Sequence, residues 1–219
     1  MLNYIFLSTN DSNIVNKARG YCRELWGDFI EKSCDDFIFL FNGKTASFIE
    51  TEKYISILDG YVRHEDLNKT NSKDPATVLP HSIALLNEIH QLKYPVSSQF
   101  SGSFSIVLFD KQTKRISLCN DLIAFSPLFY GTQKEVVFGG NFIPVLARIF
   151  NLQPDPIGIL QRISEPDYVA IGERSLLKNL NYLQNGELVQ FEQGKVIKRI
   201  FDCELYSNIK DYGGSIKNV

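Results

Sequence analysis

Cysteine and histidine, the side chains that most often act as nucleophiles, bases or metal ligands, are few here and lie far apart. The sequence has no C-x-x-C pair and no regular spacing among Cys22, Cys34, Cys119, Cys203, His64, His81 and His90. This spacing predicts no metal site. We expect Cys22 and Cys119 to be buried, unreactive thiols, and the histidines to be surface or partly packed side chains. The thiols are expected to be reduced, as in a cytosol.

The composition is that of an ordinary globular protein and argues against several classes of partner. The chain has 219 residues, of which 44% are hydrophobic and 22% charged, with 23 basic against 25 acidic side chains. A net charge of −2 without basic clusters predicts no nucleic-acid partner and no attachment to a membrane surface. The apolar runs are far shorter than the ~20 residues that span a bilayer. The first residues lack a secretion signal, so we expect a cytoplasmic protein.

The apolar pattern predicts one α+β domain over residues 1–207, followed by a flexible tail or linker over 208–219. Phenylalanine (16) and tyrosine (10) are abundant and favour strands. Strands are predicted near 2–8, 36–40, 46–49, 54–58, 103–109, 115–119, 126–130, 135–138, 187–191 and 196–201. The Asn42–Gly43 pair predicts a hairpin, the strands from 103 to 138 a meander, and the last two strands another hairpin.

Four helices are predicted between these strands, near 12–25, 77–92, 143–150 and 157–163. Asn10–Asp11–Ser12 supplies capping chemistry for the first of them. The buried faces predicted for the first two helices are Ile14, Ala18, Tyr21 and Leu25, and then Leu79, Ile83, Leu86 and Ile89.

The block from Phe104 to Tyr130 carries a succession of motifs. A Phe104–Asp110 strand, a basic turn and an Arg115–Asp121 strand precede Ser126–Tyr130. Weaker motifs follow at Phe138–Phe142, Leu183–Glu187 and Lys198–Asp202. In order and spacing, these segments resemble the glutaminase domain of the asparagine synthetase family, with its G-x-F-A-F-A-L-[WY]-D and L-x-L-A-R-D-x-x-G-x-K-P-L-Y-Y motifs. The resemblance spans nearly the whole chain and implies the four-layer αββα sandwich of the N-terminal-nucleophile (Ntn) hydrolases.

The resemblance implies a catalytic cysteine directly before the first strand, with its own α-amine as the base. Leu2 stands at that position, and its isobutyl group cannot attack an amide. Asp59–Gly60 replaces the family's Asn–Gly, so a carboxylate stands where an amide would donate to the oxyanion. Asp74 matches a carboxylate that holds the substrate's α-amine, and Lys44–Lys53 offers no arginine for the α-carboxylate. We therefore expect Leu2, Asp59, Gly60 and Asp74 to line a vestigial pocket without catalytic residues.

The synthetase half of the family carries an S-G-G-x-D-S loop for ATP pyrophosphate. Ser101–Gly102–Ser103 and Gly213–Gly214–Ser215 are too short to be that loop and lack its Asp–Ser end. The resemblance thus implies no cofactor in this chain, since ATP and Mg²⁺ would belong to a separate synthetase domain. The sequence stops where such a domain would begin, so the chain is expected to be either truncated or a stand-alone remnant.

Three functions are compatible with these residues. The first is a catalytically silent glutaminase-like domain with a structural or regulatory role in an asparagine-synthetase-like ligase, as in β-lactam synthetases and lasso-peptide cyclases. Its partner would be a synthetase domain in cis or in trans. The second is an active amidotransferase with a processed N-terminal cysteine, and the third is a stand-alone interaction module. The oligomeric state stays open, and a homo-oligomer is possible.

Overall fold

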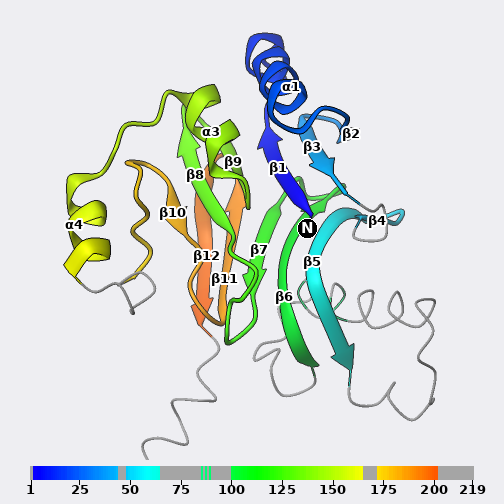
Figure 1. Cartoon of the computed structure of the whole chain (residues 1–219). Coiled ribbons are helices and arrows are strands. Elements are labelled where there is room, and N and C mark those ends of the chain that lie inside the picture. The colour runs from blue at the N-terminus through cyan, green and yellow to red at the C-terminus, as the bar shows by residue number, and fades with distance from the viewer. Residues whose placement is uncertain are drawn as a thin grey trace, which may run out of the picture.

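The computed structural model describes residues 2–43, 48–64, 85, 87, 89, 100–164 and 172–201. Within them the chain forms two six-stranded antiparallel sheets (Figure 1). In spatial order, sheet A consists of β10 (Asn181–Tyr182), β8 (Phe129–Gln133), β9 (Val136–Gly140), β1 (Asn3–Ser8), β3 (Phe37–Asn42) and β2 (Ile30–Cys34). Sheet B consists of β12 (Lys195–Phe201), β11 (Glu187–Glu192), β7 (Ile116–Asn120), β6 (Phe100–Asp110), β5 (Tyr54–His64) and β4 (Phe48–Glu50).

Aromatic side chains fill the space between the two sheets. Along β1 the residues alternate, so that Tyr4 and Phe6 face sheet B, where they share one buried cluster with side chains from β3, β5, β6 and β11. Phe37 of β3 stacks on Phe109 of β6 with 4.6 Å between the ring centroids. The phenylalanine surplus of the sequence is therefore concentrated in the packing of one sheet on the other.

Helices cover the outer faces of the sandwich. Ile5 and Leu7, the alternate residues of β1, pack with α1 (Ser12–Trp26) and α3 (Ile143–Phe150) on the outside of sheet A. On the outside of sheet B, the buried cluster includes Leu85 and Ile89, which are helical. The predicted α+β, four-layer αββα sandwich is thus confirmed. Within the described residues, no helix is both long and apolar enough to cross a membrane.

The predicted helices agree closely with the structure where it describes them. Asp11 is the N-cap of α1 and accepts a hydrogen bond from the Asn13 N–H. The third predicted helix is α3, and the fourth is α4 (Pro156–Ser164). The predicted helix over 77–92 lies outside the described residues except for 85, 87 and 89. Leu25 is wrongly predicted to be buried, because it is 37% exposed and Cys22 takes the inward position.

Two strand-pairing predictions are wrong because the chain passes from one sheet to the other. Asn42–Gly43 does not form a hairpin, because β3 belongs to sheet A and β4 to sheet B. The expected meander is split in the same way, with β6 and β7 in sheet B and β8 and β9 in sheet A. Strand β8 begins at Phe129 instead of residue 126, and β2 and β10 are additional strands. The hairpin of β11 and β12 is confirmed.

Candidate functional site

The start of β1 is held by the side chain of Asn141, which directly follows β9. The Asn141 Nδ2 donates to the Leu2 carbonyl oxygen at 2.7 Å and to the Asp59 Oδ2 at 3.1 Å. Its Oδ1 accepts from the Tyr4 N–H at 2.9 Å, and its own N–H donates to the Tyr4 carbonyl oxygen. The structure therefore brings Leu2 and Asp59, two of the predicted site residues, to one shared partner.

Gly60 follows Asp59 in β5 and has an unusual backbone conformation. Its φ of 110° is one that side chains other than glycine rarely adopt, and a Cβ there would lie 2.0 Å from the Ser103 carbonyl oxygen. Gly60 pairs with Phe104 across β5 and β6. The prediction that a strand ends at Leu58 is therefore wrong: β5 continues through Asp59–Gly60 to His64. A distorted glycine within a strand produces the same sequence pattern as a turn.

Leu2 is packed as a core residue. It is only 9% exposed and belongs to the cluster between the sheets. Its Cδ1 lies close to Gly43, where a Cβ would approach it to 3.0 Å. A small residue at position 43 thus leaves room for the leucine side chain. The side chain of Leu2 therefore fills the space between the sheets at the start of β1.

Asp59 is a half-buried carboxylate. Burial raises its pKa above the ordinary aspartate value, and the hydrogen bond from Asn141 opposes that rise. The nearby Tyr4 hydroxyl and Ser105 hydroxyl are 3.3 Å apart and bond to each other. Burial raises the pKa of Tyr4, so this phenol stays protonated at neutral pH. The hydroxyls at this site are therefore neutral groups in a buried contact.

The described cysteines lie away from this site. Cys22 is on α1, Cys34 on β2 and Cys119 on β7. Cys22 and Cys119 are buried, as predicted, and burial raises the pKa of Cys22 to about 12. A thiol with that pKa is a poor nucleophile at neutral pH.

The remaining residues that the sequence analysis considered for this site are Asp74, the histidines, Cys203 and the Ser101–Gly102–Ser103 segment. Asp74 lies outside the described residues, and so do Cys203, His81 and His90. Ser101–Gly102–Ser103 lies inside β6 and pairs with Tyr61–Arg63 of β5, so it is strand and not a phosphate loop. Within the described residues, no three His, Cys, Asp or Glu side chains gather as metal ligands would.

The Asp121 carboxylate binds backbone N–H groups of the loop after β7 and of β6. The sequence analysis did not identify this role. Its Oδ2 accepts from the Phe104 N–H at 2.6 Å, and its Oδ1 accepts from the Ala124 N–H at 2.8 Å. Phe104 is the residue opposite Gly60, so this carboxylate ties the loop after β7 to the strand pair that carries Asp59. The available signal was its place at the end of the Arg115–Asp121 motif.

Solved structures with the same fold were found at low sequence identity. Glutamine phosphoribosylpyrophosphate amidotransferase from B. subtilis, complexed with ADP and GMP, has a TM-score of 0.53 and 9% identity, covering 92% of this chain and 49% of that chain. A structure described as the allosteric regulatory enzyme of purine biosynthesis has a TM-score of 0.53 and 8% identity, with the same coverage. The chain thus spans about half the length of either structure. The likeness shows the fold, which is the Ntn-hydrolase sandwich.

Sequence comparison gives the family. No curated protein matches the chain. A family model described as a glutamine amidotransferase domain matches residues 64–202, a segment that begins after Asp59 and Gly60. Because this match covers more than half of the sequence, the chain belongs to the glutamine amidotransferase domain family.

Proposed function

We propose that this amidotransferase domain does not hydrolyse glutamine and instead has a structural or regulatory role in an asparagine-synthetase-like, ATP-dependent amide-forming ligase. The observation that carries the proposal is the set of contacts at the start of β1. There Asn141 binds both the Leu2 carbonyl oxygen and the Asp59 carboxylate. These contacts occupy the place where the family resemblance puts the nucleophile and the oxyanion donor.

The position that the resemblance assigns to the nucleophile holds a hydrocarbon side chain. Leu2 directly precedes β1, and its side chain is packed between the sheets with 9% exposure. A hydrocarbon side chain offers no lone pair to the amide of glutamine. Loss of the nucleophile in hydrolases costs ~10⁴–10⁶ in rate. Neither neighbouring hydroxyl replaces it, because Tyr4 and Ser105 bond to each other and burial raises the pKa of Tyr4.

The site also lacks a free donor for the oxyanion of the reaction. A tetrahedral intermediate needs donors aimed at its negative oxygen. Asp59 supplies a carboxylate there, which repels that charge whenever it is ionised. An asparagine amide has two N–H hydrogens, and those of Asn141 already go to Leu2 and Asp59. The site therefore offers repulsion in place of stabilisation, and changing Leu2 alone does not correct it.

The partner follows from the resemblance to asparagine synthetases. A synthetase domain, in cis or in trans, would hold the ATP and Mg²⁺ and would activate a carboxylate.

Glutamate release from glutamine tests the silent site. Purified full chain, Leu2→Cys and Leu2→Cys/Asp59→Asn are compared with a blank without protein, and mass spectrometry determines whether Met1 is retained. We expect an intact Met1 and no turnover in the wild-type chain or in Leu2→Cys. Glutamate release by the wild-type chain would overturn the proposal. Turnover in Leu2→Cys alone would show that Asp59 does not oppose the reaction.

The ligase role is tested separately. The reading frame after Val219 and the neighbouring genes are searched for an S-G-G-x-D-S motif, and the encoded synthetase is co-expressed with a tagged form of this chain. Such a motif together with a co-purifying synthetase supports the role. A stop codon without any neighbouring synthetase gene would instead favour a stand-alone interaction module.

A further inference from the structure

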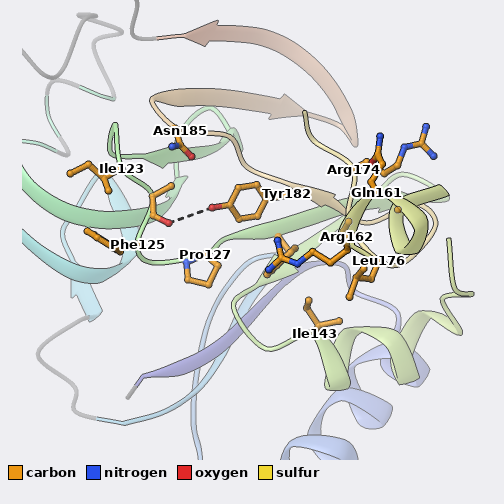
Figure 2. A pocket seen from close by; sticks show the side chains of 14 residues that line it. Ile123, Phe125, Pro127, Ile143, Gln161, Arg162, Arg174, Leu176, Tyr182 and Asn185 are labelled. Carbon is orange, nitrogen blue, oxygen red and sulfur yellow. Dashed lines mark hydrogen bonds between the residues drawn. The ribbon is translucent and has the colours of Figure 1, made fainter. Parts of the chain in front are cut away.

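A cavity of about 550 Å³ lies between α4 and the loop that follows β7 (Figure 2). Ile123, Ala124, Phe125 and Pro127 of that loop form one wall. Gly158, Gln161 and Arg162 of α4 form the opposite one. This volume lies within the ~300–1,000 Å³ of small-molecule sites. The cavity shares no lining residue with the contacts among Leu2, Asp59 and Asn141.

Most of the lining is apolar. Pro127, Ile143, Leu176 and the ring of Tyr182 surround the space, and Phe125 lies at its edge in Figure 2. Phe125 is 76% exposed, although large aromatic side chains are usually buried. An apolar molecule in the cavity would remove part of this hydrocarbon surface from water.

One cation in this cavity has no ion-pair partner among the described residues. Arg174 forms an ion pair with Asp155, with 2.9 Å between Nη1 and Oδ2. Arg162 forms no ion pair with a carboxylate of the described residues, and Figure 2 shows it extending from α4 into the cavity toward Pro127 and Tyr182. The pKa of Tyr182 lies above its ordinary value because burial and the charge of Asp121 raise it. The positive charge of Arg162 partly opposes that rise. The hydroxyl of Tyr182 is already used as a donor to the Ala124 carbonyl oxygen at 3.3 Å.

We propose that this cavity binds a small carboxylate with an apolar body, its carboxylate on Arg162 and its body against Pro127, Leu176 and Tyr182. A guanidinium and a carboxylate form parallel charge-assisted hydrogen bonds, which fixes the orientation of such a ligand. The single charge of Arg162, which pairs with no carboxylate of the described residues, matches one negative charge, and the apolar lining matches an aromatic or branched hydrocarbon. The site does not depend on the function proposed for the start of β1.

The probe is 3-phenylpropanoate, with the uncharged 3-phenylpropanamide as the matched compound. Both are titrated into the full chain by calorimetry and by amide chemical shifts in NMR. We expect one saturable site for the carboxylate, with a dissociation constant on the order of 1 mM or tighter. Shift changes should centre on residues 123–125 and 158–162, and the amide should bind at least about tenfold more weakly.

Matched variants assign the binding to the cavity. Arg162→Gln should weaken 3-phenylpropanoate at least about tenfold. Arg23→Gln, at an exposed arginine on α1 that does not line this cavity, should leave the affinity unchanged. Leu176→Trp, which fills the space from its half-exposed position, should abolish binding, and all variants should keep the wild-type circular dichroism spectrum.

Three results would overturn the proposal. One is the absence of saturable binding up to about 20 mM carboxylate. Another is equal affinity for the carboxylate and the amide, or an unchanged affinity in Arg162→Gln. The third is a dimer in solution that Phe125→Ser dissociates, because this surface would then be the interface with a second copy of the chain.

Discussion

Asn141 and Asp59 join the two sheets at the amino end of β1. The Asn141 Nδ2 donates to the Asp59 Oδ2 at 3.1 Å, although 82 residues separate them in the sequence. Asn141 follows β9 of sheet A, whereas Asp59 belongs to β5 of sheet B. The same nitrogen binds the Leu2 carbonyl oxygen. One amide therefore positions the start of β1 against both sheets.

Removal of this amide should destabilise the fold. Asn141→Ala leaves the Tyr4 N–H and the Leu2 carbonyl oxygen without their side-chain partners. We expect the free energy of unfolding to fall by about 2–3 kcal/mol, measured by urea denaturation, because partly buried backbone groups lose hydrogen bonds. Asn13→Ala, on the exposed side of α1, is the control and should change it by less than about 0.5 kcal/mol. Equal effects of the two variants would contradict the role of Asn141.

Asp59 should make stability depend on pH. Burial raises its folded-state pKa above the ordinary value, so the folded chain binds this proton more readily than the unfolded chain does. Its contribution to stability is therefore greatest below the ordinary aspartate pKa and is lost as pH rises through the raised folded value. Asp59→Asn removes the charge and should gain no more than about 1 kcal/mol at pH 7, since the residue is only partly buried.

The comparison for Asp59 is made by urea denaturation at pH 4, 5, 6 and 7. The gain from Asp59→Asn should grow from the lowest pH to the highest. Asp28→Asn, at an exposed carboxylate, is the control and should change the free energy of unfolding by less than about 0.5 kcal/mol. A gain from Asp59→Asn that is largest at pH 4 would show that the sign is wrong.

The sequence predicted local structure better than the crossings between the sheets. Continuous apolar runs such as Ile5–Leu7 predict buried strands, and the capping residue Asp11 correctly marks the start of α1. The sequence does not say which sheet a strand joins, because the alternation of side chains is the same in both. For that reason β3 and β4, or β7 and β8, were predicted as neighbours.

The candidate site was predictable only in part. The family resemblance pointed to Leu2 and Asp59, since both stand at fixed places in its motifs. Asn141 stands inside the weaker Phe138–Phe142 motif, but that motif does not predict its contacts, because they depend on the approach of β9 to β1 and β5 in space. Arg162 and its cavity were also missed, since an exposed arginine near the end of an amphipathic helix is ordinarily a solvated side chain.

Arg199 should stabilise two carboxylates on the far side of the sandwich. It lies 2.6 Å from the Glu173 Oε2 and 3.2 Å from the Oε1 of the fully buried Glu187. Arg199→Ala leaves Glu187 buried with its Oε1 uncompensated, so the free energy of unfolding should fall by about 3 kcal/mol at pH 7. Arg148→Ala is the control, because its ion pair with Glu24 is exposed and should contribute less than about 1 kcal/mol.

The loss in Arg199→Ala should shrink in acid. Burial already raises the pKa of Glu187, and loss of the neighbouring cation raises it further. The folded variant therefore takes up a proton at a pH where the unfolded chain stays ionised, and its stability rises as pH falls through that raised value. Denaturation at pH 5 and pH 8 measures this difference. A larger loss at pH 5 than at pH 8 would contradict the assignment.

Glycine at position 124 should stabilise the fold, because the backbone of Ala124 is strained. Its φ is 52°, a conformation that costs an alanine about 1–2 kcal/mol, and the resembling family motif has glycine there. Ala124→Gly keeps the N–H bond to Asp121 and the carbonyl bond from Tyr182, both of which use the backbone. After the extra entropy of glycine in the unfolded chain is subtracted, thermal and urea denaturation should show a gain of about 0.5–1 kcal/mol.

Ala147→Gly, inside α3, is the matched substitution and should lose about 1 kcal/mol. The same chemical change is made at both positions, and a loss of stability at both would show that Ala124 is not strained.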